Sequence, residues 1–248
     1  MEKHKGYQRL LEEGEKSTKE KLIFKISSKY KFLERKYWEL SRLGLYGLKD
    51  IPNIKTASKI LDIGCGSGSS FVYIKNFLNP NADFLGVDLH KNQELPDFVS
   101  FKVCDIDKDA LPYEDESIDL VISIYVLEHL YNPGNLFSEA YRVLKKGGYF
   151  YCVTEYYTSL FCPDKYNFYQ DPTHVRPWTK GALKSLGKMK GFDNIKVKRV
   201  RPIEYLGIIP FIPLLEVFKI ADVSFIFAEL LAGKTIMAMY KKDDEKHF

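Results

Sequence analysis

Apolar residues in the middle of the chain gather in short runs that alternate with stretches of helical spacing. Ile60, Leu61 and Ile63 form one such run, and residues 69–78 follow it with apolar positions three or four apart. A short run that ends at glycines is typical of a buried parallel strand, and the spacing after it predicts an amphipathic helix. Further strands are predicted over residues 82–88, 98–105, 120–124, 149–154, 192–201 and 234–240, and further helices over 135–144 and 179–189.

Three glycines end the first predicted strand. Gly64, Gly66 and Gly68 are spaced two apart; glycine allows the backbone angles of a tight turn and lets the main chain approach a ligand. Strand, glycine turn and helix form the first unit of a nucleotide-binding α/β domain. Asp88 ends the next predicted strand 24 positions after Gly64, near the spacing of roughly 20 residues that brings a carboxylate to a ribose. We therefore expect a nucleoside cofactor here.

The link between the second and third predicted strands is short. Only residues 89–97 join them, whereas a parallel crossover through a helix needs about a dozen residues or more. We expect the helix to be reduced to about a turn or replaced by a loop, which leaves one face of the sheet thinly covered.

The sequence Asp62-Ile-Gly64-Cys65-Gly66-Ser-Gly68 resembles motif I of the class I S-adenosylmethionine-dependent methyltransferases, and of their type-11 and type-23 members. Asp105-Ile106, the Val-Leu-Glu-His sequence at 126–129 and the Leu-Lys-Lys-Gly-Gly-Tyr-Phe sequence at 144–150 extend the resemblance. It implies a Rossmann-like, mostly parallel seven-stranded sheet with the last strand antiparallel and helices on both faces. It also implies S-adenosyl-L-methionine as the cofactor.

The resemblance further implies which residues hold that cofactor. The acid at Asp105 would receive the adenine amino group and Ile106 would border the ring; the alternative role for Asp105 is to cap a helix or turn. The end of the fourth strand would line the crevice where open α/β sheets bind ligands. The implied cofactor residues are Asp62, Gly64, Cys65, Gly66, Gly68, Asp88, Leu89, Asp105, Ile106, Ser123, Ile124 and Tyr125.

Glu128 and His129 are candidates for contact with the substrate. Neighbours on a helix point about 100° apart, so we expect that the two side chains do not face one substrate atom. Structural roles compete with a substrate role: an acid near the positive end of a helix, and a hydrogen-bonded histidine.

The segment 166–179 is rich in aromatic residues and punctuated by prolines, which predicts a loop at the carboxyl edge of the sheet. Its sequence Asp-Pro-Thr-His-Val-Arg-Pro-Trp-Thr, at 171–179, resembles a stretch of methyltransferases of polysaccharide and glycoconjugate synthesis. His174 is the candidate catalytic residue, as a general base toward a sugar hydroxyl.

Three further residues of this loop are candidates for binding the acceptor. Arg176 could hold a phosphate or carboxylate, and Tyr169 and Trp178 could stack on the apolar face of a sugar. In the alternative interpretation, His174 and Arg176 lock the loop through hydrogen bonds to Asp171 and to the backbone.

Composition and charge narrow the class of protein. A chain of 248 residues with 45% hydrophobic residues suits one sizeable domain with an elaboration. The net charge is +6 over residues 1–55, −7 over 56–160 and +5 over 161–248. The basic flanks are either solvated surface or contacts to an anionic substrate or membrane surface.

The four cysteines lack metal-ligand spacing, so we expect no metal, and they are typical of buried thiols in a reducing compartment. No apolar stretch follows residues 1–6, so no signal peptide is evident and a cytoplasmic location is expected.

The flanks suggest two additions to the methyltransferase domain, which we place at 56–248. Residues 1–55 have a helical pattern and would form a cover over the cofactor, as in the resembled family. Residues 202–232 form an apolar insert before the last strand, whose uncharged run is too short to span a bilayer. The insert would be buried, form a dimer contact, or make peripheral membrane contact through 205–231; the protein would be a monomer or a homodimer.

The sequence therefore predicts a methyltransferase that acts on a small molecule or glycan, with oxygen as the expected acceptor atom. An RNA or tRNA methyltransferase is one alternative, although no RNA-binding module is recognisable and no nucleic-acid partner is expected. A lipid- or quinone-type methyltransferase and a cofactor-binding protein without activity are others. An NAD-dependent oxidoreductase is disfavoured by the glycine spacing.

Overall fold

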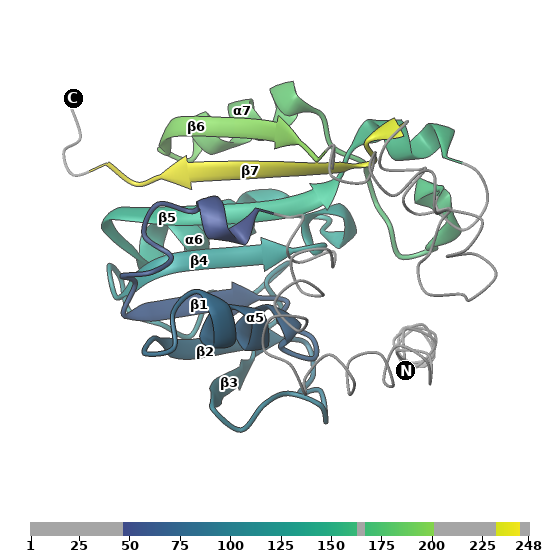
Figure 1. The fold of residues 1–248 in the computed structure, drawn as a ribbon. Helices are drawn as coiled ribbons and strands as arrows, with labels where there is room; N and C mark the ends of the chain where they lie inside the picture. Colours follow the sequence, from purple (N-terminus) through teal and green to yellow (C-terminus); the bar gives the residue numbers. More distant parts are fainter. Residues whose placement is uncertain (1–46, 163–166, 201–231, 244–248) are drawn as a thin grey trace, which may run out of the picture.

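One seven-stranded sheet forms the centre of the molecule (Figure 1). The computed structural model describes residues 47–162, 167–200 and 232–243. The strands are β1 (Lys59–Ile63), β2 (Asp83–Asp88), β3 (Val99–Val103), β4 (Ile118–Ile124), β5 (Leu144–Glu155), β6 (Asp193–Arg199) and β7 (Thr235–Lys241). They lie in the order β3-β2-β1-β4-β5-β7-β6, and every neighbouring pair is parallel except those that β7 forms with β5 and β6. The predicted α/β sheet with an antiparallel last strand is confirmed.

The order of strands reverses beside β1. The chain adds β2 and then β3 on one side of β1, and afterwards β4 and β5 on the other side. In open α/β sheets a crevice forms at such a reversal, outside the carboxyl ends of the strands. The ends of β1 and β4, at Ile63 and Ile124, are therefore where a ligand site is expected.

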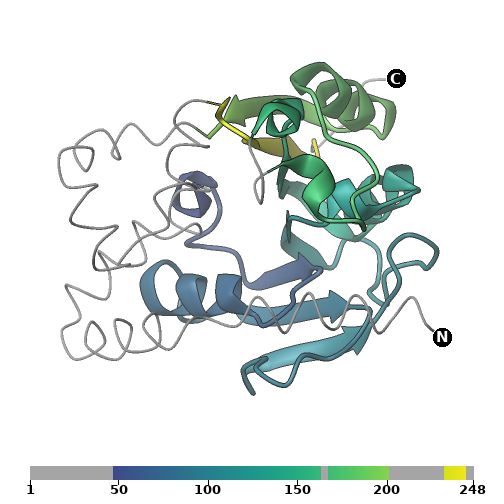
Figure 2. The ribbon, with the colours of Figure 1, turned by 90° about the vertical axis from the view of Figure 1, so that its right-hand side faces the viewer.

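Helices cover both faces of the sheet (Figures 1 and 2). The helix α5 (Ser69–Phe77) and the 3-10 turn η1 (Leu48–Asp50) pack on one face, and α6 (Pro133–Val143) and α7 (Lys180–Met189) pack on the other. Successive side chains of a strand alternate between faces. Ile60 of β1 accordingly joins the cluster under α5, whereas its neighbour Leu61 joins the cluster under α6.

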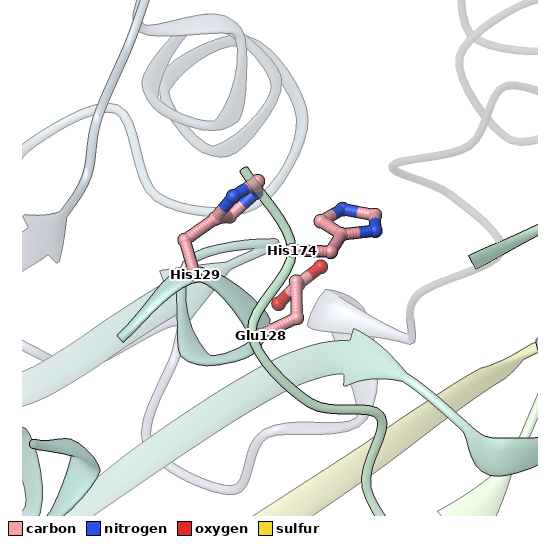
Figure 3. Close-up of side chains that lie close together, drawn as sticks. All are labelled: Glu128, His129 and His174. Atoms are coloured by element: carbon pink, nitrogen blue, oxygen red, sulfur yellow. The ribbon is translucent and has the colours of Figure 1, made fainter. Parts of the chain in front are cut away.

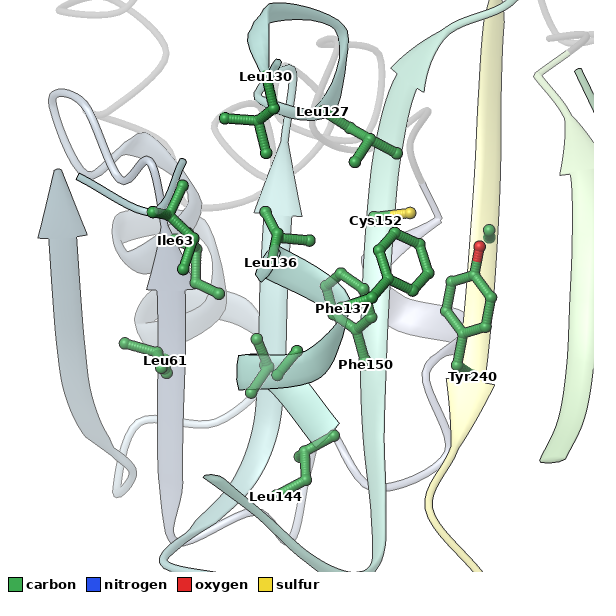
Figure 4. Close-up of a cluster of buried hydrophobic side chains, with 14 of the residues drawn as sticks. Leu61, Ile63, Leu127, Leu130, Leu136, Phe137, Leu144, Phe150, Cys152 and Tyr240 are labelled. Carbon is green, nitrogen blue, oxygen red and sulfur yellow. The ribbon is translucent and has the colours of Figure 1, made fainter. Parts of the chain in front are cut away.

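The core under α6 contains a group of aromatic rings in contact (Figure 4). Phe137 of α6 meets Phe150 of β5 edge to face, with ring centroids 5.2 Å apart, and Tyr240 of β7 at 5.1 Å. Edge-to-face pairs contribute about 0.5–1.5 kcal/mol each beyond the area that they bury. These contacts join the helix to the strands on the far side of the crevice and hold that part of the scaffold rigid.

The described helices begin at residues suited to their first turn. Gly68, with φ of 73°, precedes α5, Pro133 stands at the first position of α6, and the Thr179 hydroxyl caps α7 by accepting from the Ala182 N–H. A proline at this position sacrifices no helical hydrogen bond, and a threonine cap satisfies an otherwise unpaired N–H.

The link between β2 and β3 contains no helix, as its length predicted. As a result, β3 is poorly covered: Val103 is 68% exposed, and Phe98 packs on Phe84 with the Lys75 ammonium 4.9 Å from the Phe98 ring centroid. Because no helix follows β2, the carboxyl ends of β2 and β3 are not covered by a helix from this link, which leaves room for a ligand there.

A hydrogen-bond network ties the segment after β3 to α6. The Arg142 guanidinium donates to the carbonyls of Leu111 and Tyr113 and pairs with Glu139 and Asp115 at 2.6 Å each. Buried carbonyls that lose such a donor remain unsatisfied. Arg142 therefore holds a structural loop in place at a distance from the ends of β1 and β2.

Parts of the sequence predictions fall outside the described residues. These are the N-terminal cover apart from residues 47–55, most of the insert at 202–232, and the membrane contact proposed for 205–231. Within 47–55, Leu48, Ile51 and Ile54 are buried on the α5 face of the sheet. Among the helices that the structure describes, none has the length and hydropathy required to cross a bilayer.

Candidate functional site

The glycine turn after β1 has backbone angles that favour glycine. Gly64, Gly66 and Gly68 all have positive φ, at 75°, 49° and 73°, in the region that side chains with a Cβ disfavour. A Cβ at Gly64 would lie 2.2 Å from Cγ2 of Val126, and one at Gly68 would lie 2.8 Å from Leu95 and Pro96. Among the residues that the structure describes, and apart from its two chain neighbours, a Cβ at Gly66 would meet no atom within 4 Å. The turn is thus packed from behind at its two ends and open at its middle.

The carboxylate of Asp88 lies against this turn. Its Oδ2 accepts from the Gly66 N–H at 2.9 Å, and its Oδ1 accepts from the Leu89 N–H at 2.7 Å. A carboxylate offers about four acceptor positions, so two of them are left for ligand hydroxyl groups. A direct hydrogen bond thus joins Gly66 to Asp88, which lies 22 positions later in the sequence; cofactor binding by Asp88 and Leu89 stays a prediction.

Asp62 lies beneath the turn and is almost fully buried, at 3% exposure. Its Oδ2 accepts from the Ser70 hydroxyl at the start of α5. Burial, opposed by the Ser70 hydrogen bond and helped by the nearby Asp88, raises the pKa of Asp62 to about 7. The neighbouring Cys65 thiol is also buried, which raises its pKa well above the ordinary range. The thiol is therefore protonated and packs as an apolar group against Gly86.

Asp105 lies two residues beyond the end of β3, and the Cys104 N–H before it donates to the carbonyl of Asp88 at the end of β2. Its own carboxylate closes a turn: Oδ1 accepts from the Asp107 N–H, and Oδ2 pairs with Lys108 at 2.7 Å. These contacts show Asp105 capping a turn, as the alternative interpretation expected. Adenine binding by Asp105 and by the buried Ile106 stays a prediction.

The end of β4 contributes a strained residue. Tyr125 has a φ of 56°, uncommon for a residue with a bulky side chain and frequent at functional sites. Its N–H donates to the Val153 carbonyl, and its hydroxyl is bonded to Thr235 at 2.7 Å. Ser123 is buried, Ile124 is half-buried, and both lie at the strand end that the sequence assigned to the cofactor crevice. The turn at Tyr125 directs the following residues over the end of the sheet.

A polar cluster of Glu128, His129 and His174 lies just beyond this turn (Figure 3). Glu128 and His129 belong to the 3-10 turn η2 (Leu127–His129), and His174 comes from the loop that crosses over it. The His129 and His174 rings lie 4.7 Å apart between centroids. The expectation that Glu128 and His129 cannot face one atom is wrong, because one potential ligand atom from each of the three residues lies within 4.8 Å of the others.

Glu128 is fully buried. Its Oε2 accepts from the Thr154 hydroxyl at 2.8 Å, and its Oε1 has no hydrogen-bond partner among the described residues. Burial raises the pKa of Glu128 to about 8. Its backbone carbonyl accepts from the Val175 N–H at 2.8 Å, which fixes the 166–179 loop above the turn.

Hydrogen bonds select the same tautomer for both histidines. Nδ1 of His174 lies 2.6 Å from the Phe168 carbonyl, which can only accept, so Nδ1 carries the proton. The Thr173 hydroxyl donates to Asp171 and therefore accepts from Nδ1 of His129, 2.9 Å away. In the neutral form of each ring, Nε2 then has a free lone pair. Burial and the neighbouring His174 lower the pKa of His129, which favours the neutral form.

The other loop candidates have separate positions. Tyr169 is 70% exposed and packs on Phe168, and Arg176 is exposed with a guanidinium N–H donated to the Tyr131 carbonyl. Trp178 is buried in the core under α6, and its indole N–H reaches the Leu127 carbonyl at 3.3 Å. The prediction that Trp178 is a stacking surface is corrected: its ring packs in the core and supports η2.

Sequence reasoning missed several polar residues of the site. Thr154 and Thr173 orient Glu128 and His129, and Glu155, at the end of β5, forms a buried ion pair with Lys234 at 2.7 Å. Threonine and strand-end acids are common elsewhere, so their type alone does not mark them. Only the position of Glu155 at a predicted strand end could have suggested it.

Comparison with known families identifies the domain that bears this site. Residues 61–152, from the middle of β1 to the middle of β5, match the family model described as a methyltransferase domain. The chain carries a class I S-adenosylmethionine-dependent methyltransferase domain. The cofactor of this methyltransferase domain is S-adenosyl-L-methionine, which agrees with a glycine turn that is open at Gly66 and a carboxylate with unused acceptor positions.

Relatives place the methyltransferase domain among diverse enzymes. The chain is 27% identical over 158 residues to 2-methyl-6-phytyl-1,4-hydroquinone methyltransferase 1 of Oryza sativa, covering 60% of this chain and 46% of that protein. It is 26% identical over 175 residues to demethylmenaquinone methyltransferase of Staphylococcus saprophyticus, covering 59% of this chain and 75% of that protein. The chain thus spans under half of the first of these relatives and three quarters of the second.

A solved structure shares the fold. Phosphoethanolamine N-methyltransferase 2 of Haemonchus contortus, in complex with S-adenosyl-L-methionine, superposes with a TM-score of 0.58 at 18% identity. The match covers 85% of this chain and 60% of that one.

Proposed function

We propose that this protein transfers the methyl group of S-adenosylmethionine to an oxygen of a small-molecule or glycan acceptor. The observation that carries the proposal is the pairing of two sites at neighbouring strand ends. The glycine turn and Asp88 suit the nucleoside of the cofactor, and the polar cluster of Glu128, His129 and His174 lies beyond β4 on the acceptor side. Val126 packs against Gly64 of the glycine turn and directly precedes η2, which carries Glu128 and His129. Val126 therefore connects the two sites.

The reaction is an in-line displacement. A lone pair of the acceptor oxygen forms a bond to the methyl carbon, and the carbon–sulfur bond breaks with its electron pair going to the sulfonium. The protein contributes by aligning oxygen, carbon and sulfur and by excluding water. A hydroxyl is a poor nucleophile until its proton is lost. The cluster supports an oxygen acceptor because it presents lone pairs at Nε2 of His129 and His174, to which a hydroxyl proton can pass.

Aromatic side chains around the cluster support an acceptor with a flat or apolar face. Tyr131 and Tyr169 are 77% and 70% exposed, and both are joined to the loop that carries His174. Such rings stack on sugar faces or on quinone rings. The relatives that act on hydroquinone and demethylmenaquinone therefore make a quinol-type acceptor the second candidate, beside a glycan of polysaccharide synthesis.

The test combines cofactor binding with acceptor screening. Calorimetry with S-adenosylhomocysteine is expected to give a 1:1 binding isotherm, and the absence of heat would refute the proposal. Labelled methyl transfer is then measured with sugar, sugar phosphate and quinol acceptors in parallel. Transfer to a nitrogen or sulfur acceptor in preference to all of these would contradict the oxygen assignment.

The proposed enzyme comprises a methyltransferase domain at 56–248 with residues 1–55 as a cover, and it acts in the cytoplasm as a monomer or homodimer. Leu48 and Ile51 are buried on the sheet. The chain around the proposed boundary, residues 48–57, is therefore packed against the domain and is not a free linker. Light scattering of the purified chain distinguishes monomer from dimer.

A further inference from the structure

The polar cluster has the composition of a metal centre. One carboxylate and two imidazoles, with further coordination positions open, form a ligand set that binds divalent transition metals in proteins. One potential ligand atom from each of Glu128, His129 and His174 lies within 4.8 Å of the other two. We propose that these three residues form a binding site for a divalent metal ion, which holds the acceptor oxygen next to the cofactor.

The buried carboxylate is the first support for this site. Glu128 is 0% exposed, and only its Oε2 is engaged, by the Thr154 hydroxyl. Oε1 receives no hydrogen bond from the residues that the structure describes. A buried carboxylate oxygen without a partner is costly unless a cation or a donor reaches it. A metal ion bound to Oε1 supplies that partner, while Thr154 continues to orient the carboxylate through Oε2.

The histidine tautomers are the second support. A histidine that binds a metal through one ring nitrogen ordinarily donates its other N–H to an oxygen of the protein. His174 donates from Nδ1 to the Phe168 carbonyl, and His129 donates from Nδ1 to the Thr173 hydroxyl, which Asp171 orients in turn. Both rings therefore have Nε2 available as the ligand atom. Each ring is therefore already held in the orientation that presents Nε2 to an ion.

The geometry requires a modest contraction on binding. Bonds of about 2.0–2.2 Å to a tetrahedral ion place ligand atoms roughly 3.4 Å apart. The potential ligand atoms lie within 4.8 Å of one another, so binding of the ion would draw the three side chains closer together. Asp171, with Oδ2 3.9 Å from Nε2 of His174, adds negative charge near the ion.

The role of the ion in methyl transfer rests on the proposed function, whereas its binding does not. A metal-bound hydroxyl loses its proton to water far more readily than a free one. Glu128, His129 and His174 would hold the ion, which would supply an ionised acceptor oxygen; as the oxygen–carbon bond formed, the carbon–sulfur bond would break, giving an ether and S-adenosylhomocysteine. Nε2 of His174 cannot bind the ion and act as a base at once, so a metal role replaces the general-base role that the sequence suggested.

Cobalt binding tests the site without cofactor or acceptor. The full chain is stripped with a chelator, dialysed and titrated with Co²⁺, whose visible absorption reports histidine ligands. We expect one ion per chain, bound at least tenfold more weakly by His129→Ala and by His174→Ala. His90→Ala, which removes a histidine outside the cluster, should bind as the unchanged protein does. Thr173→Val, which removes only the acceptor of the His129 N–H, should weaken binding about tenfold.

Two outcomes would overturn the proposal. One is that the unchanged chain retains no Co²⁺; the other is that both histidine variants, shown by circular dichroism to be folded, bind Co²⁺ as tightly as it does. Calorimetry with S-adenosylhomocysteine on stripped protein keeps this result separate from the proposed function. If stripped and metal-loaded protein transfer methyl groups at equal rates, the ion has no part in the reaction and His174 returns to the role of a base.

Discussion

Two glycines of the same turn are expected to fail in different ways when replaced by alanine. Both Gly64 and Gly66 have positive φ, at 75° and 49°, and alanine in this region costs about 1–2 kcal/mol. The surroundings differ, however. A Cβ at Gly64 would lie 2.2 Å from Cγ2 of Val126, whereas a Cβ at Gly66 would have no atom within 4 Å in the described part of the chain, its two chain neighbours apart.

The magnitudes follow from these distances. Carbon atoms in contact are ordinarily about 3.5–4.0 Å apart, so Gly64→Ala must displace Val126. The overpacking adds about 1–3 kcal/mol to the backbone cost. Gly66→Ala carries only the backbone cost with respect to the described residues, but its methyl group would enter the space proposed for the cofactor. We expect Gly64→Ala to lower the free energy of unfolding by roughly 2–5 kcal/mol in total.

Urea denaturation and calorimetry separate the two effects. Gly66→Ala should unfold within about 2 kcal/mol of the unchanged protein yet bind S-adenosylhomocysteine at least tenfold more weakly. Unchanged affinity in Gly66→Ala would show that the open side of the turn does not face the cofactor. Equal destabilisation of the two variants would show that the contact with Val126 is not limiting.

Three further predictions concern single residues. Asp88→Asn should weaken binding of S-adenosylhomocysteine at least tenfold, because an amide NH₂ replaces one of the oxygens that accept from the Gly66 and Leu89 N–H groups. Asp83→Asn, at the other end of β2, is the matched control. An equal loss of affinity in both variants would contradict the role of Asp88. The pKa of Asp62 is raised to about 7, so between about pH 4 and 7 the native state retains a proton that the unfolded chain has released. The free energy of unfolding should therefore fall by up to about 1.4 kcal/mol per pH unit as the pH rises through this window. Asp62→Asn should flatten that slope in urea titrations at several pH values, and an unaltered slope would assign it to other groups. Arg142→Met should lower the free energy of unfolding by about 2–3 kcal/mol, since the Leu111 and Tyr113 carbonyls lose their donor. Cofactor affinity should stay within twofold. A large loss of affinity with little loss of stability would refute this structural role.

The sequence alone was sufficient wherever a feature depends on residues close together in the chain. The apolar run at Ile60–Ile63 and the glycines after it predicted a strand and a turn, because backbone angles and side-chain alternation are local properties. The nine residues of 89–97 excluded a full crossover helix by length alone, and the structure has none there. The spacing of Asp88 placed it against the glycine turn, since parallel strands bring their carboxyl ends to one edge.

Only the tertiary structure decided how distant polar side chains meet. Glu128 and His129 were expected to diverge as sequence neighbours, yet the loop bearing His174 folds over η2 and is held there by the Val175 N–H on the Glu128 carbonyl. The burial of Trp178 and the self-capping of Asp105 likewise depend on the path of the chain after β5 and β3. A loop's path is determined by many weak contacts between residues that are distant in sequence. The periodicity of hydrophobic residues does not predict such contacts. The residues of the proposed metal site could be identified individually from the sequence, whereas their convergence required the folded chain.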